Sequence, residues 1–263
     1  MKLSDVLYLD EGMQTASEAL DKGIAAIALD AGGVILLSPE RTLAVLRKMK
    51  KTREALWDAS RQLANRATVG TVKYQQDGTL RDCCKVRTSA GVNRFGPLAY
   101  QLVMANITPM WLHSDSSLSA GSSNVWNTMY KLSGLGGVYQ RQWLGDLSSS
   151  GGEDDTIDTL NISFTAAETG WDLNTNPYEN PGSADTTESG FLRFLATQTH
   201  MKPEQYGQMW AYRLAAQPPE IAALFAAGSD LKKKIVGEGI VPESALTKLF
   251  KDTIELFFDR RYD

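Results

Sequence analysis

Cysteine and histidine are scarce in this sequence of 263 residues, and each scarcity excludes a kind of site. The only cysteines, Cys83 and Cys84, are adjacent, so a disulfide between them cannot join distant parts of a fold. The only histidines are His113 and His200, too few for a histidine-rich metal site, and no spacing of cysteines or carboxylates resembles a zinc site. We therefore expect no bound metal, no cofactor and no stabilising disulfide.

Long apolar runs and an excess of basic charge are also lacking. The most apolar stretch, residues 23–37, is interrupted by Asp30 and a pair of glycines, and it is too short to span a bilayer. The first residues do not have the pattern of a signal peptide. A formal net charge of −4 argues against a surface that binds nucleic acid all over, although it leaves room for a local basic patch. We expect a soluble globular protein without a membrane segment.

Helical patterns occupy the two ends of the chain. Apolar residues recur every three or four positions in residues 13–27, and again from a helix start at Ser38, Pro39 and Glu40. This second pattern predicts one long helix over residues 38–66, with a basic face opposite its apolar stripe. The same reasoning predicts helices in the last quarter at residues 203–216, 218–228 and 243–258, the second of them stopped by Gly228.

A β-hairpin is predicted between the helical parts. Residues 69–75 and 79–88 are rich in β-forming side chains, and Asp77-Gly78 between them is a typical tight turn. Alternation places Cys84 on the inner face and Cys83 on the outer face, which predicts one buried and one exposed thiol. The outer face also carries the cations Lys73, Arg81, Lys85 and Arg87.

These cations form a basic stripe that has two readings. Together with the cationic face of the long helix, the stripe suits the backbone of DNA or an acidic partner. Scattered cations on a net-acidic protein are also common on an ordinary solvated surface. Both readings stay open on the sequence alone.

The remaining pattern completes a predicted fold class: mainly α with a small β component, as a helical bundle with a β-hairpin insertion and long polar loops. Residues 126–143 are assigned no regular structure, and residues 148–155 are typical of a linker. We predict a single domain over residues 1–263. Its parts are a helical segment 1–67, the hairpin 69–88, a loop-rich middle 114–190 and a helical segment 202–258.

Two short stretches contain residues suited to catalysis. His113, Ser114 and Asp115 are the residue types of a hydrolytic triad, but neighbours in sequence rarely reach triad geometry, so a polar loop is the better interpretation. The segment from Glu168 to Trp171 resembles the motif around the acidic residue of some peptidoglycan-cleaving glucosaminidases. That resemblance implies Glu168 as general acid.

In such a hydrolase the acid has a raised pKa and protonates the leaving oxygen, and a second carboxylate assists. Asp172 is the first candidate for this partner, and Asp185 or Glu188 are the others.

The layout of the N-terminal third resembles the head-to-tail adaptor (connector) proteins of short-tailed bacteriophages. A short helix leads through a glycine break to the long helix 38–66, whose second half carries Arg53, Leu56, Trp57 and Ala64. The resemblance implies a non-enzymatic structural protein that forms a ring with copies of itself and contacts portal and tail proteins. It also implies a C-terminal docking arm with the side chains Phe257, Phe258, Arg260, Arg261 and Tyr262.

The leading functional expectation is therefore a virion assembly component without catalytic residues, assembled in the host cytoplasm and with a possible contact to the DNA backbone. The glycan hydrolase that uses Glu168 and Asp172 is the alternative. A monomeric binding module without enzymatic activity is a third reading.

Overall fold

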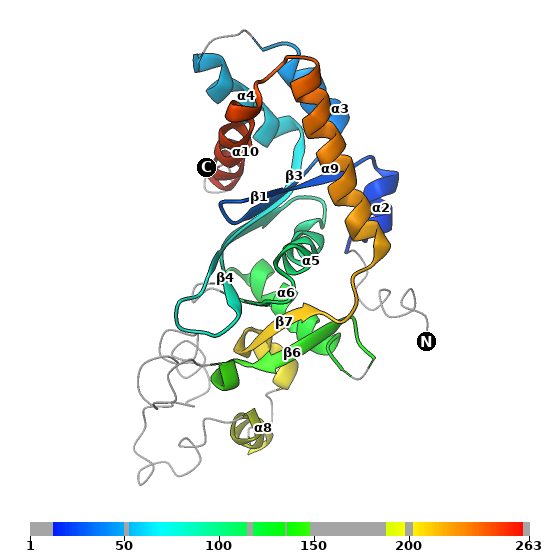
Figure 1. Cartoon of the computed structure of the whole chain (residues 1–263). Helices are drawn as coiled ribbons and strands as arrows, with labels where there is room; N and C mark the ends of the chain where they lie inside the picture. Colours follow the sequence, from blue (N-terminus) through cyan, green and yellow to red (C-terminus); the bar gives the residue numbers. More distant parts are fainter. Residues whose placement is uncertain are drawn as a thin grey trace. The chain divides into compact units, whose positions relative to one another are not determined.

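The computed structural model describes residues 13–49, 53–114, 118–134, 136–147, 188–197 and 202–259 (Figure 1). Its contacts divide the chain, for which the sequence predicts one domain, into two compact units. Unit 1 contains Gln75–Arg87 and Ile107–Ala216, and unit 2 contains Leu9–Tyr74, Thr88–Asn106 and Gln217–Asp263. Each unit has buried clusters of its own, so we describe each one separately.

The strands form a seven-stranded mixed sheet with the order β1-β2-β3-β4-β5-β7-β6. They are β1 (Ala25–Leu29), β2 (Gly33–Leu37), β3 (Thr68–Gln76), β4 (Cys83–Gly91), β5 (Trp111–His113), β6 (Tyr139–Trp143) and β7 (Trp210–Leu214). Strands β4 and β5 run parallel, whereas β1–β2, β2–β3, β5–β7 and β6–β7 are antiparallel pairs. The predicted class, a helical bundle with a small β component, is therefore wrong.

The error arises in part from residues 25–37, where the expected helix 13–27 was followed by a glycine break and a β-hairpin is found. Strands β1 and β2 read Ala-Ala-Ile-Ala-Leu and Gly-Val-Ile-Leu-Leu, and nearly every one of these residues is buried. A strand covered on both faces is a continuous apolar run, which periodicity cannot distinguish from a buried helix. The amide of Gly32 donates to the carbonyl of Leu29 in the turn between them.

Unit 2 packs its helices around an aliphatic core. The helices are α2 (Ala16–Asp21), α3 (Pro39–Leu46), α4 (Arg53–Arg66), α5 (Gly96–Ile107), α9 (Pro219–Gly237) and α10 (Glu243–Asp259). The largest buried cluster joins leucine, isoleucine, valine and alanine side chains of β1, β2, α3, α4, α9 and α10, together with Phe250. Burial of this apolar surface is the main stabilising contribution in the unit.

The predicted helix over residues 38–66 is two helices. Ser38 caps the first as expected, because its hydroxyl accepts a hydrogen bond from the amide of Arg41, and α3 then ends at Leu46. The second helix, α4, begins at Arg53. Residues 50–54 contain no apolar side chain, so the stripe that would hold a continuous helix against the core is interrupted there.

Helix α9 does not stop at Gly228 but continues to Gly237. A Cβ atom at position 228 would lie 1.9 Å from the carbonyl oxygen of Ala26 in β1. The glycine therefore permits a close approach of α9 to β1, and packing rather than helix termination explains it.

Unit 1 contains the start of β4 with β5, β7 and β6, and helices rich in aromatic side chains. The helices are α6 (Ala120–Lys131), η2 (Leu144–Leu147), α8 (Glu188–Thr197) and the 3-10 segment η3 (Pro203–Met209). Two predictions are corrected here. Residues 210–214 are the strand β7 and not the end of a helix, and residues 126–143 include the second half of α6 and all of β6.

Several aromatic side chains of unit 1 pack around one tryptophan. Trp210 is the centre of this aromatic cluster, with ring centroids 4.5 Å from Tyr130, 5.2 Å from Trp143 and 5.9 Å from Phe191. The guanidinium of Arg141 lies over the Tyr130 ring at 4.1 Å from its centroid. No helix in the described ranges is long and apolar enough to cross a membrane.

Candidate functional site

In unit 1, an aspartate at the turn between β3 and β4 contacts a buried histidine. Asp77 directly follows β3, and His113 is the last residue of β5. The Oδ2 atom of Asp77 lies 3.0 Å from Nε2 of His113, whose side chain is fully buried. The other carboxylate oxygen accepts hydrogen bonds from the amide and hydroxyl of Thr79, both at 2.7 Å, and from the amide of Leu80. The carboxylate therefore closes the turn and fastens it to β5.

These bonds set the electrostatics of the pair. The hydrogen bond from His113 is the largest effect on the carboxyl of Asp77 and holds its pKa well below the usual range, against the opposing effect of burial. The bonds from Thr79 act in the same direction. The second ring nitrogen of His113, Nδ1, is buried without a hydrogen-bond partner. In a fully buried ring, neither nitrogen can reach a substrate in this structure.

Both cysteines lie next to this pair, at the start of β4, and both are buried. The prediction that Cys83 is exposed is therefore wrong. Its side chain packs in a small cluster with Leu80, Leu144 and Ala211. Burial first, and then the charge of Asp77, raises the pKa of the Cys83 thiol to about 12.

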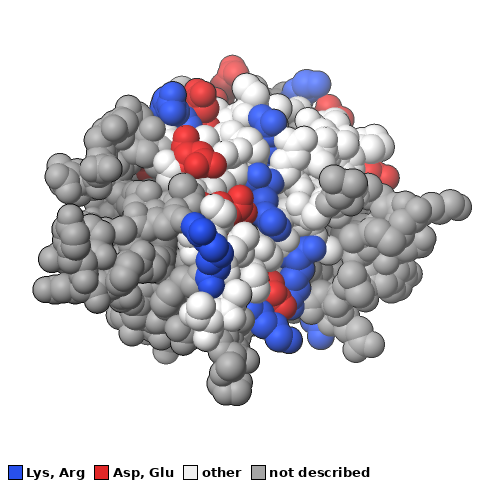
Figure 2. Space-filling view, turned by 90° about the horizontal axis from the view of Figure 1, so that it is seen from below, with Lys and Arg blue, Asp and Glu red and all other residues white. Residues whose placement is uncertain are grey.

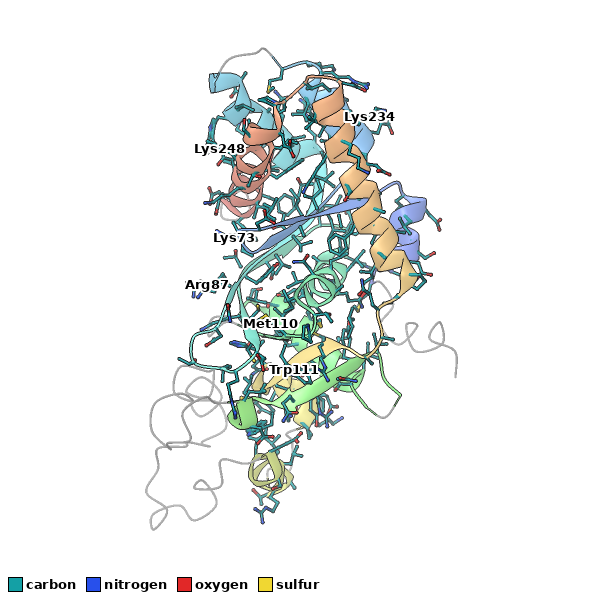
Figure 3. The ribbon with its side chains drawn as sticks, in the orientation of Figure 1. Lys73, Arg87, Met110, Trp111, Lys234 and Lys248 are labelled. Atoms are coloured by element: carbon teal, nitrogen blue, oxygen red, sulfur yellow. The ribbon has the colours of Figure 1, made fainter. Side chains whose placement is uncertain are left out.

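Burial likewise raises the pKa of Cys84, whose Sγ lies 3.9 Å from Sδ of Met110. Figure 3 labels Met110, which directly precedes β5, and Trp111, the first residue of β5. Thiols with raised pKa values stay protonated at neutral pH and are poor nucleophiles and metal ligands.

The structure pairs His113 with a different carboxylate from the one beside it in sequence. Asp115 lies outside the described residues, and the partner that the structure provides is Asp77, which precedes the histidine by 36 positions. Sequence reasoning recognised Asp77 only as a turn residue. Its Asp-Gly turn was the available signal, but nothing in the sequence connects that turn to β5.

The predicted basic stripe of the hairpin is present only in part. Arg81 and Arg87 are exposed, and Figure 3 shows Arg87 pointing away from the ribbon. Lys85 is half-buried. Lys73 is also half-buried, and its Nζ forms an ion pair at 2.6 Å with Glu255 of α10. Two of the four cations are therefore fully presented to solvent.

Cations on the described surface are not limited to the hairpin. On the face of the molecule that Figure 2 presents, Lys and Arg side chains form a band with Asp and Glu side chains beside it. The distribution agrees with a protein of mixed surface charge that has local basic areas.

The predicted docking arm begins inside the core. Phe257 is buried near the end of α10, in a cluster with Ala64 and Ala90, and Phe258 is half-buried beside it. Phe257 therefore belongs to the core of unit 2 and not to a free tail. The other three predicted side chains of the arm, Arg260, Arg261 and Tyr262, lie outside the described residues.

Of the four carboxylates of the hydrolase alternative, only Glu188 lies within the described residues. Glu168, Asp172 and Asp185 lie outside the described residues. Glu188, at the start of α8, accepts a hydrogen bond of 2.8 Å from Nε1 of Trp210 and lies 3.8 Å from Nε of Arg141. It thus supports the aromatic cluster of unit 1.

Within the described ranges, no group of three or more His, Cys, Asp or Glu side chains is arranged to hold a metal ion. Comparison of this chain with protein-family models, with curated proteins and with solved structures finds no match.

Proposed function

We propose that this chain is a non-enzymatic structural protein that works by binding during assembly. In its specific form it is a component of a virion head-to-tail connector, where it forms a ring with copies of itself and contacts portal and tail proteins. The observation that carries the proposal is the placement of the reactive side chains. His113, Cys83 and Cys84 are buried in unit 1, and the carboxylate that binds the histidine also closes a turn.

The outer surface of α4 supplies a contact for assembly. Trp57 is 51% exposed, the largest exposed fraction among the large apolar side chains of the described residues. Exposed tryptophan is enriched in protein interfaces because a large apolar ring with one polar group gains much from desolvation. The helical-bundle layout no longer supports the connector reading, so Trp57 and the amphipathic helices α3 and α4 are the part of that resemblance that persists.

The test is the mass of the native complex. Protein isolated under native conditions from its natural source is expected as a large complex of many copies with other virion proteins. Trp57→Ser is expected to reduce the complex to smaller species, while the matched surface variant Val236→Ser, at a residue 36% exposed on α9, leaves it intact. A lone monomer, or equal behaviour of the two variants, contradicts the proposal.

The docking arm is tested by a truncation that spares the core. Removal of residues 260–263 leaves Phe257 in place, so the melting temperature is expected to stay unchanged while incorporation into the complex falls. Glu168→Gln serves as the control for the hydrolase alternative. Cell-wall cleavage by the wild-type protein that is lost in this variant would contradict the non-enzymatic part of the proposal.

A further inference from the structure

Helices α3 and α4 of unit 2 pack against each other, and residues of both line an open groove of about 460 Å³. Three cations line it: Arg41 from α3, Lys48 just after α3, and Arg66 from the last turn of α4. The side-chain amides of Gln62 and Asn65 complete the polar lining. No Asp or Glu is among the lining residues, all of which belong to the described part of the chain.

The groove is held in a defined geometry. The Nη1 atom of Arg41 donates to the carbonyl oxygen of Arg66 at 3.3 Å, which positions this guanidinium across the C-terminal end of α4. The bond uses one of the five N–H donors of Arg41, so donors remain for a ligand. All three cations lie near the C-terminal end of a helix, which by itself favours positive charge. That preference does not explain why cations from both helices line one groove with no Asp or Glu among its lining residues.

A neighbouring cation shows the contrast. Arg47, next to Lys48 in sequence, donates to both carboxylate oxygens of Glu238 at 2.9–3.0 Å and is not part of the lining. Its charge is compensated within unit 2. The groove thus concentrates cations without acids in its lining, in a protein whose formal net charge is −4.

We propose that the α3–α4 groove binds the phosphodiester backbone of nucleic acid. The planar donor forks of Arg41 and Arg66 match the oxygens of a phosphate, and Lys48 adds a point charge. Asparagine and glutamine amides are regular donors to phosphate and sugar oxygens. The open form of the groove admits a continuous strand, and contacts of this type carry no sequence preference.

An acidic peptide is the competing ligand, and the lining favours nucleic acid. Protein interfaces depend on aromatic and apolar anchors in desolvated pockets. The apolar part of this lining is limited to Ala44 and Val45, and Val45 is already buried in the core of unit 2. The groove offers an acidic peptide positive charge but no exposed apolar pocket for a side chain. This inference goes beyond the proposed function, and it stands or fails without ring assembly.

The test measures binding of the full-length protein to a labelled random-sequence DNA duplex of about 20 base pairs over a series of salt concentrations. The test variant is Lys48→Gln/Arg66→Gln. The slope of log K against log salt is negative, and each lost phosphate contact makes it shallower by about 0.9. The double variant should therefore have a slope shallower by about 1.8 and an affinity about 60-fold weaker at 0.1 M salt. Circular dichroism checks that the variant is folded.

The matched control is Arg61→Gln, which removes the same charge from an exposed position of α4 outside the groove. It should change affinity far less than removal of either groove cation. Failure of the wild-type protein to bind the duplex, or an equal effect per charge of control and groove variants, overturns the proposal. Binding of poly-glutamate through Lys48 and Arg66 without binding of DNA would assign the groove to an acidic protein and overturns it as well.

Discussion

The cores of the two units are built from different kinds of apolar side chain. Unit 2 uses leucine, isoleucine and valine from long amphipathic helices and from β1 and β2. Unit 1 uses tryptophan, tyrosine and phenylalanine from short strands and short helices, and Trp126, Trp143 and Trp210 are among its largest fully buried side chains. Large rings let a few residues bury much surface, which suits short elements that each contribute only two or three side chains.

The largest expected effect is the loss of the central ring of unit 1. Trp210→Ala should lower the free energy of unfolding by about 3–5 kcal/mol, because it removes contacts with three rings and leaves a large cavity. Denaturant unfolding followed by tryptophan fluorescence measures this change. The control is Trp57→Phe at the exposed tryptophan of unit 2, where a change within about 0.5 kcal/mol is expected. Similar losses in both variants would contradict the central role of Trp210.

The second effect tests close packing in unit 2. Gly228→Ala places a methyl group 1.9 Å from the carbonyl oxygen of Ala26, so α9 must move from β1 and stability should fall by about 2–3 kcal/mol. Gly237→Ala, in the same helix, meets no atom within 4 Å and should be neutral or stabilising by about 0.5 kcal/mol. Thermal unfolding of both variants decides the point. If Gly228→Ala were as stable as Gly237→Ala, the glycine would have no packing role.

The difference between the cores also explains how far the sequence could be interpreted. Helix α10 and the hairpin β3–β4 are found close to their predicted places, because each has a regular pattern and clear terminal signals. Residues 25–27 of β1 and residues 210–214 of β7 were misassigned as helix, and β2 was assigned no element. In all three, strands buried in a sheet carry no alternation of apolar and polar residues, so only tertiary contacts identify them.

The candidate sites were less predictable than the fold. The pairing of Asp77 with His113 depends on the parallel pairing of β4 with β5, which places residues far apart in sequence side by side. The α3–α4 groove depends on a break in what was predicted as one helix. Exposure of the single residues could not separate Lys48, which lines the groove, from Arg47, which pairs with Glu238. Both sites therefore depend on tertiary contacts between segments far apart in sequence, which local sequence patterns do not reveal.

A third prediction concerns the polar link in unit 1. His113→Leu removes the donor to Oδ2 of Asp77, and the loss of this mostly buried bond should lower stability by about 1–3 kcal/mol at pH 7. The control Asp82→Asn removes a carboxylate from an exposed position near the same turn and should change stability by less than about 0.5 kcal/mol. An equal effect of the two variants would show that the link is not needed.

The same variant has a defined dependence on pH. The folded-state pKa of Asp77 is depressed, so its contribution is complete above the ordinary value of about 3.9 and is lost as pH falls through the folded pKa. His113→Leu removes the largest cause of the depression, and the carboxyl pKa, followed by NMR, should therefore rise towards its ordinary value. The stability gap between wild type and variant measured at pH 5 should narrow at pH 3.

The smallest expected effect concerns Lys73, the hairpin cation that forms an ion pair with Glu255 within unit 2. Lys73 and Glu255 are both partly exposed, with side-chain exposures of 35% and 43%, so solvent and salt screen their attraction. A double-mutant cycle with Lys73→Ala and Glu255→Ala should give a coupling energy of about 0.5 kcal/mol, and less at 1 M salt. Because the pair contributes so little, a partner with several negative charges could displace Glu255. A coupling energy above about 2 kcal/mol would instead show that Lys73 mainly stabilises the fold. The exposed cations of the basic stripe would then be Arg81 and Arg87.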